Sequence, residues 1–344
     1  MNKSRNFISW FVALSFAALA LFIANLWFGS VLINWGKIFQ VLFHPEKTQS
    51  TAQVIVLSYR LPMAVTALAT GIILSLSGLV LQTLFRNPLA GPSVLGISSG
   101  ASLGVALVVL SSGLFHFELT TFPLLNNLTI IVAAFAGALF VLAIILVVSA
   151  RVGNVITVLI IGIMLGYAVS ALVSVLQFFS RSAELHAYVL WGLGSFSKTT
   201  ILQSVMLLVT AMAGWGIVLF FAKPLNALLM GESYASSIGI PVQSIQRILI
   251  LLTGLLVAIG TAFTGPIAFL GLAVPHLARA LFKTSQHNIL IPGTAILGAN
   301  LALLCNLIAK MPGYDISLPI NAVTSLIGAP VIIWVIIKSR HIKF

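Results

Sequence analysis

The chain has 344 residues, of which 60% are hydrophobic and only 6% are charged. A soluble domain carries roughly 25% charged residues, so the composition excludes a soluble globular protein. The 17 lysines and arginines outnumber the 5 acids, yet they are scattered singly between apolar runs. Because they form no basic stripe, the net charge of +12 does not indicate a nucleic-acid-binding protein. We therefore expect a lipid bilayer to surround most of the chain.

Long apolar runs follow one another along the sequence, and a helix needs ~20 such residues to cross a hydrocarbon core about 30 Å thick. The runs are apolar on every face, as membrane-spanning helices are. We therefore predict an all-α polytopic membrane protein with about ten transmembrane helices in one domain, residues 1–344. The predicted spans are residues 7–28, 57–84, 91–110, 128–148, 155–176, 201–222, 248–264, 267–282, 290–309 and 318–337.

The orientation follows from the lysines and arginines in the short loops, which concentrate on the cytoplasmic side of membrane proteins. With a cytoplasmic amino terminus, eleven of the 17 fall inside and six outside. This split predicts a multi-pass protein of the cell (inner) membrane with both termini in the cytoplasm. The inner set is Lys3, Arg5, Arg86, Arg151, Lys223, Arg247, Arg279, Lys283, Lys338, Arg340 and Lys343, and the outer set is Lys37, Lys47, Arg60, Arg181, Lys198 and Lys310.

Three segments interrupt the apolar pattern, in chain order residues 86–92, 223–247 and 265–276. The first and third are rich in proline and glycine and are predicted to break helices at or near membrane depth. Broken backbone there must be buried in protein or line a wet cavity. In the second, a cytoplasmic loop, Gly231 and Gly239 are predicted to separate two short helical pieces.

Residues 192–199 imitate a phosphate-binding loop. That motif requires a glycine directly before the lysine, whereas Ser197 precedes Lys198 here. The segment also follows no predicted strand and is predicted to lie outside the cell. We therefore predict no nucleotide site on this chain, so that ATP-driven work must come from a partner.

The ionisable residues do not indicate catalysis. All five acids are predicted in loops or near interfaces, no two share a helix face, and no HExxH motif occurs, which argues against a proton-coupled carrier and a metalloprotease. The single Cys305 excludes an intrachain disulfide and a cysteine metal site. We predict no catalytic residue and no metal site, and we interpret His276 as a packed, backbone-bonded residue, with a ligand role as the alternative.

Glycines spaced four residues apart occur at Gly100 and Gly104 and again at Gly162 and Gly166. Such pairs let helices approach closely. In a chain with 27 glycines the spacing arises often. We therefore interpret both pairs as close packing within the chain rather than as a dedicated dimer contact.

Short motifs recur in both halves of the chain. The first half contains Arg60-Leu-Pro-Met63, Ser77-Gly78, Gln82, Arg86-Asn-Pro-Leu-Ala90, Gly96 and Gly100-Ala101. The second half contains residues 265–279 (GPIAFLGLAVPHLAR), Leu290-Ile-Pro292, Gly298-Ala299, Leu318-Pro319 and Gly328-Ala-Pro330. In these motifs and their order, the chain resembles the FecCD family of ABC importer permeases over nearly its whole length.

The resemblance implies a type II ABC importer permease that pairs with a second permease copy, expected to be identical. It also implies two ATP-binding subunits and a periplasmic or lipid-anchored substrate-binding protein as partners. This chain would then bind no cofactor and would not be an enzyme, because ATP and Mg²⁺ bind on the partner ATPase. We expect the cargo to be an iron complex such as a ferric siderophore, with cobalamin, haem or an oxyanion as alternatives. From other classes, an autonomous secondary carrier and a structural assembly protein remain alternatives.

The resemblance also implies docking residues for the binding protein. In the family, an Arg-Leu-Pro-Arg motif and a basic residue at the outer end of the ninth span pair with glutamates of that partner. Arg60 and Lys310 match these positions, but Met63 replaces the second arginine and Lys310 stands where arginine is usual. Lysine lacks the bidentate fork of arginine, so docking could be weaker. The alternative for Arg60 is an interfacial anchor that snorkels.

The cytoplasmic segment 223–247 resembles the coupling helices with which the family contacts its ATPase. The coupling residues expected from this resemblance are Leu225, Gly231, Glu232, Ala235 and Gly239. The alternative is an ordinary amphipathic loop helix.

Gate and pathway residues follow from the same resemblance. Asn87 and Leu89 match the inner gate loop, and Asn154 and Val155 fall near its partner loop, although all four could serve as helix caps. The fifth and tenth spans are expected to line the central pathway. The candidates on these spans are Gly162, Gly166, Asn321, Thr324 and Ser325.

Overall fold

The computed structural model of the chain describes residues 2–31, 33–43, 51–111, 123–311 and 317–338, and all regular structure in these ranges is helical. In chain order the elements are α1 (Asn2–Trp27), α2 (Trp35–Phe43), α3 (Thr51–Gln53), the π-helix η2 (Val54–Arg60), α4 (Leu61–Leu84), the 3₁₀ helix η3 (Pro92–Leu95), α5 (Ile97–Val109), α7 (Pro123–Val152), α8 (Val155–Phe179), α9 (Ser182–Gly192), α10 (Ile201–Phe220), α11 (Ala222–Met230), α12 (Glu232–Ser237), α13 (Val242–Thr264), α14 (Leu270–Phe282), α15 (His287–Ala309) and α16 (Ile320–Lys338).

The described helices confirm the all-α polytopic prediction. Seven helical stretches are long and apolar enough to cross a membrane, and α5, α14 and most of α16 form three shorter apolar helices. These ten correspond in order to the ten predicted spans. The second is longer than predicted, because α3 and η2 extend it back to Thr51. The predicted span 91–110 is interrupted where Gly96 adopts a left-handed conformation between η3 and α5.

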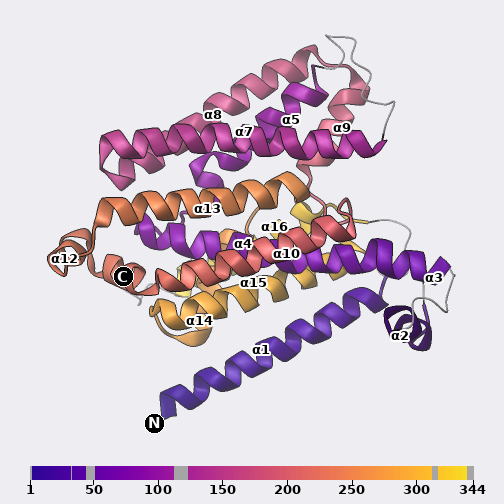
Figure 1. Ribbon diagram of the computed structural model, residues 1–344, viewed down its shortest axis with the longest axis horizontal. Coiled ribbons are helices and arrows are strands. Elements are labelled where there is room, and N and C mark those ends of the chain that lie inside the picture. Colours follow the sequence, from indigo (N-terminus) through magenta and orange to yellow (C-terminus); the bar gives the residue numbers. More distant parts are fainter. Residues whose placement is uncertain (1, 32, 44–50, 112–122, 312–316, 339–344) are drawn as a thin grey trace.

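Helix α4 forms the centre of the bundle, between α10, α13, α14 and α15 (Figure 1). Twenty of its 24 residues are buried. A helix that is apolar on every face can be buried on all sides, as α4 is at the centre of the bundle. Helices α5, α7 and α8 pack together on one side of this centre, and α1 lies on the opposite side, mainly against α15 (Figure 1).

Glycines allow the closest helix contacts. A methyl group on Gly100 would lie 2.6 Å from the Val141 side chain on α7, and one on Gly137 would lie 2.9 Å from the Gly104 nitrogen on α5. One on Gly162 would lie 3.1 Å from the Leu95 Cα of η3. Gly100, Gly104 and Gly162 therefore pack closely within the chain, as predicted for these three glycines.

Candidate functional site

The candidate residues gather at two opposite ends of the helix bundle. Helix α12 and the start of α1 lie at one end, and α2, α3 and α9 lie at the other (Figure 1). We name these the inner end and the outer end. The coupling and gate candidates belong to the inner end, and the docking candidates belong to the outer end.

At the inner end, α11 and α12 are the two short helices predicted for the cytoplasmic segment. Gly231 separates them with a φ of 120°, and Gly239 follows with a φ of 83°, both in a region that side chains with a Cβ rarely adopt. This confirms the predicted division by the two glycines. Leu225 and Ala235 are fully buried, so they anchor the segment on the bundle and are not available to a partner.

Three exposed apolar side chains of this segment were missed in the sequence: Met230 is 71% exposed, Tyr234 49% and Ile238 54%. No single helical pattern links them, because Met230 ends α11, Tyr234 lies in α12 and Ile238 follows the end of α12. We call these three residues the apolar patch of the inner end. Glu232, in contrast, accepts a hydrogen bond of 2.9 Å from Gln246 Nε2, which ties α12 to α13.

The loop between α4 and η3, residues 85–91, contains the gate candidates. The side chain of Asn87 accepts a hydrogen bond from the Leu89 nitrogen at 2.9 Å, and Leu89 is 51% exposed. His276 of α14 places its Nε2 atom 2.7 Å from the Pro88 carbonyl oxygen, in agreement with its interpretation as a backbone-bonded residue. A methyl group on Gly231 would lie 3.6 Å from the Arg86 guanidinium, so this loop also lies beside the coupling segment.

The second pair of gate candidates lies at the start of α8. Asn154 is the N-cap of that helix, because its side chain accepts a hydrogen bond of 2.9 Å from the Ile156 nitrogen, and Val155 is buried. The cap alternative therefore holds for Asn154. Gly162 is buried against η3, where its missing side chain makes room for Leu95, and its role as a pathway residue stays a prediction. Gly166 is half-buried, and a methyl group on its Cα would lie 3.5 Å from the Ser99 hydroxyl.

At the outer end, both docking candidates bind the last turn of α1. Arg60 is only 5% exposed and donates hydrogen bonds to the carbonyl oxygens of Leu26 (2.9 Å), Trp27 (2.7 Å) and Val31. Lys310 donates through Nζ to the Asn25 carbonyl at 2.8 Å. Cations are favourable at a helix C-terminus, where carbonyl groups lack partners within the helix. The two residues therefore hold the end of α1, whatever else they bind.

Lys310 lies just beyond the end of α15, and burial lowers its pKa to about 7, with the Arg60 charge as a second cause. Its ammonium group is thus charged in full only below neutral pH. A lysine with such a pKa is a weaker cation at neutral pH than an arginine would be.

Asn321 joins three segments at the outer end. Its side-chain nitrogen donates to the carbonyl oxygens of Pro266 (2.7 Å) and Gly192 (3.1 Å), and its oxygen accepts from the Ala268 nitrogen at 2.9 Å. The residue therefore fixes the break between α13 and α14 against the end of α9. Of the other α16 candidates, Thr324 is buried and Ser325 is half-buried.

Replacing Asn321 by leucine is expected to lower the free energy of unfolding by about 3 kcal/mol, because three hydrogen bonds of about 1 kcal/mol each are lost. Denaturant unfolding of the purified protein in detergent measures this change. Thr324→Val is the control, since its hydroxyl donates only to the Asn321 carbonyl of the same helix, at 3.3 Å. Equal effects of the two variants would contradict the role of Asn321.

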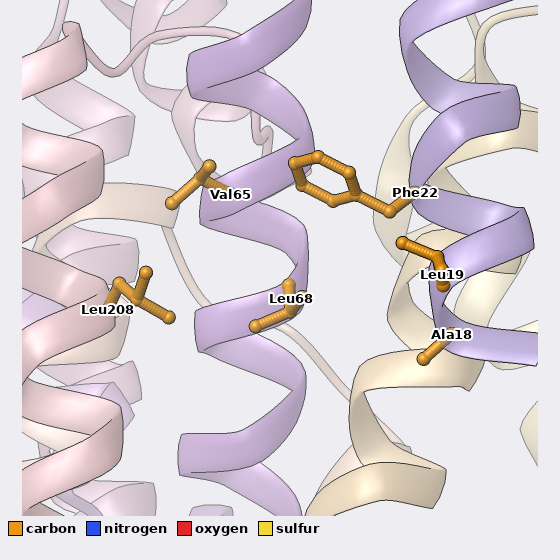
Figure 2. A pocket seen from close by; sticks show the side chains of 6 residues that line it. All are labelled: Ala18, Leu19, Phe22, Val65, Leu68 and Leu208. Carbon is orange, nitrogen blue, oxygen red and sulfur yellow. The ribbon is translucent and has the colours of Figure 1, made fainter. Parts of the chain in front are cut away.

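A hollow of about 370 Å³ lies between α1, α4 and α10 (Figure 2). Its lining residues are Ala18, Leu19, Phe22, Val65, Leu68 and Leu208. All six side chains are apolar, whereas a cargo site normally adds a few polar groups that fix the orientation of its ligand. We therefore do not assign cargo binding to this hollow.

Comparisons with known proteins identify the family of this chain. The sequence model of the FecCD transport family matches residues 17–338. The vitamin B12 import system permease protein BtuC of Shigella boydii is 33% identical over 342 residues, 99% of this chain and 98% of that protein. BtuC of Escherichia coli O9:H4 (strain HS) is 33% identical with the same coverage.

Solved structures give similar matches. An inward-facing structure described as a metal-chelate type ABC transporter has a TM-score of 0.82 at 29% identity, covering 95% of this chain and 98% of that chain. PsaBC from Streptococcus pneumoniae in complex with Fab has a TM-score of 0.54 at 17% identity, covering 87% and 95%. The second match indicates a shared fold alone.

Proposed function

This chain belongs to the FecCD transport family and is the membrane permease of a type II ABC importer, and from this premise we propose that it imports a metal chelate. The observation that carries the proposal is the match over 99% of the chain to vitamin B12 permeases, together with the metal-chelate type neighbour. The cargo first expected from the sequence, a ferric siderophore, is one such chelate. Vitamin B12 is the second candidate, and the names of the two BtuC relatives, which are vitamin B12 import permeases, favour it.

Co-purification tests this cargo. The chain is purified gently from native membranes with its partners, and the metal in the bound substrate-binding protein is analysed. Iron supports a ferric siderophore and cobalt supports vitamin B12. A cargo without a metal contradicts the proposal.

The proposed mechanism is alternating access, in which the bundles of two permease copies rock against each other. Two separate ATPases hold ATP and Mg²⁺ and contact the inner end of each copy. The apolar patch supports this contact, because exposed apolar side chains at the water-facing end of a membrane protein favour a protein partner. Residues 85–91 and the start of α8 then open or close the inner side of the pathway, with Leu89 exposed for a contact between copies.

A periplasmic or lipid-anchored binding protein would deliver the cargo to the outer end. Arg60 and Lys310 support this proposal as a pair of cations at one place on that end, because both donate hydrogen bonds to carbonyl oxygens in the last turn of α1. Because Arg60 is buried, a direct ion pair with the partner requires its guanidinium to leave the carbonyl oxygens of α1. Lys310 is only partly buried and holds one carbonyl oxygen where Arg60 holds three, so it is the better residue for a test of docking.

Lys310→Gln is expected to weaken binding of the binding protein to the permease about tenfold at low salt, because one charge-assisted contact is lost. Binding is measured in lipid nanodiscs at low and high salt. Lys310→Arg should retain binding, since it keeps the charge and adds the fork. Lys198→Gln is the control, because it removes an exposed charge from another loop. An affinity that neither Lys310→Gln nor salt changes would contradict docking at this residue.

A further inference from the structure

A path of hydrogen bonds, buried at its inner part, runs from the coupling segment to the end of the central helix. The side-chain oxygen of Asn226, on α11, accepts a hydrogen bond of 2.8 Å from the His287 nitrogen and lies 2.9 Å from His287 Nδ1. On the other side of the ring, His287 Nε2 lies 2.9 Å from the Thr83 hydroxyl of α4. Thr83 and His287 are each 1% exposed. Three helices are thus joined through one imidazole.

The contact at Asn226 replaces a cap that α15 lacks. Helix α15 begins at His287, and its own N-cap residue, Gln286, makes no side-chain hydrogen bond to the first turn. The first N–H groups of a helix have no partner within that helix. Asn226 of α11 supplies a hydrogen-bond acceptor for the first N–H group of α15. A displacement of α11 therefore acts directly on the start of α15.

The hydrogen bonds fix the state of the His287 ring. The backbone N–H of His287 points at this Asn226 atom, which identifies the atom as the side-chain oxygen. An amide oxygen has no proton to donate, so the His287 Nδ1 atom beside it must carry the proton. In the neutral ring Nε2 is then an acceptor, and the Thr83 hydroxyl, which also donates to the Leu79 carbonyl of its own helix at 3.0 Å, shares its one proton between the two acceptors. The roles of Asn226 and of the two ring nitrogens are thus fixed, and the Thr83 hydroxyl lies between the ring and the backbone of its own helix.

Thr83 connects this link to residues 85–91. It lies in the last turn of α4, and its carbonyl oxygen accepts a hydrogen bond of 3.2 Å from the Arg86 nitrogen. The carbonyl oxygen of its neighbour Gln82 accepts from the Asn87 nitrogen at 3.1 Å. The Gln82 side chain is itself held by Arg279 of α14, whose Nη1 donates at 2.6 Å. The start of the loop therefore depends on the position of this turn.

We propose that Asn226, His287 and Thr83 are positioning residues that transmit movement of α11 to residues 85–91. The inference rests on the proposed function, because it needs α11 to be moved by the ATPase. None of the three residues is assigned to contact cargo. Their role is to couple ATP hydrolysis to the opening of the loop of residues 85–91.

The test measures cargo transported per ATP hydrolysed by the complete transporter in lipid vesicles. Asn226→Leu and Thr83→Val should each lower this ratio about tenfold, the effect that a lost buried hydrogen bond has on an equilibrium. ATP hydrolysis and ATPase co-purification should stay near the wild-type level. Asn226→Asp keeps the acceptor oxygen and should restore the ratio. The double variant should lose less than the product of the two single losses, because both act through His287.

Thr253→Val is the matched control for Thr83→Val. Thr253 is equally buried on α13, but its hydroxyl donates only to the Leu249 and Ile250 carbonyls of its own helix. An equal fall of the ratio in both threonine variants would reduce Thr83 to a packing residue and overturn the proposal, as would wild-type ratios in Asn226→Leu and Thr83→Val. If the wild-type complex itself shows no ATP-driven uptake, the proposed function fails, and the inference fails with it.

Discussion

Replacing Gly78 by valine is expected to leave little or no folded protein in the membrane. A Cβ atom at this position would lie 2.9 Å from the Gly271 Cα of α14 and closer still to the Gly271 carbonyl. Both are backbone atoms, so no side-chain rotation can relieve the overlap. The contact is equally tight on the other helix, because a Cβ on Gly271 would meet the Pro92 ring and the Leu74 carbonyl oxygen of α4. We expect a loss of about 3 kcal/mol or more, a large part of the stability of a typical domain.

Size-exclusion elution and the melting temperature in detergent measure this effect. Gly216→Val is the matched control, since Gly216 lies on α10 and a Cβ there meets no atom within 4 Å. That variant should elute and melt close to the wild type. A monodisperse Gly78→Val protein with an unchanged melting temperature would show that α4 and α14 can separate, against the packing described above.

The second large effect is expected from two acids in the apolar patch. The double variant Tyr234→Asp with Ile238→Asp places two charges where exposed apolar side chains are proposed to contact the ATPase. Because an unpaired charge in a desolvated contact is costly, we expect a loss of binding of about 100-fold or more and no measurable ATP-driven uptake. The fold should survive, since both side chains are exposed.

Co-purification of the ATPase and uptake into vesicles measure this loss. Ser285→Asp, in the exposed turn between α14 and α15, adds a charge at the inner end outside the patch and serves as the control. Full uptake by the double variant would exclude the patch as the contact. Loss of uptake by the control as well would indicate a general effect of negative charge at this end.

The transmembrane spans could be predicted from the sequence because length and hydrophobicity alone define them. The burial of most of α4 could not be predicted, since a helix in lipid and a helix in a protein core are equally apolar. The start of the second span was also misplaced. Residues 51–56 include polar side chains, and the π-helical turns that follow them depend on packing against α1 and α2.

Some features of the candidate site could also be predicted from the sequence, and others could not. Gly231 and Gly239 could be predicted as helix ends, because a glycine signal is local in the sequence. The contact of Asn226 with His287 spans 61 residues, and that of Arg60 with Leu26 spans 34. No local sequence pattern around Asn226 or His287 indicates a partner so far away in the chain. Arg60 was expected at a docking surface, and its burial under α1 required the tertiary structure.

The central claim is that a separate ATPase powers this permease. The most direct measurement reconstitutes the purified chain in lipid vesicles with and without its co-purifying ATPase and binding protein, and follows uptake of the metal chelate. We predict uptake only with all partners and ATP, and none from a proton gradient. Uptake by the chain alone, driven by a proton gradient, would contradict the account and indicate a secondary carrier.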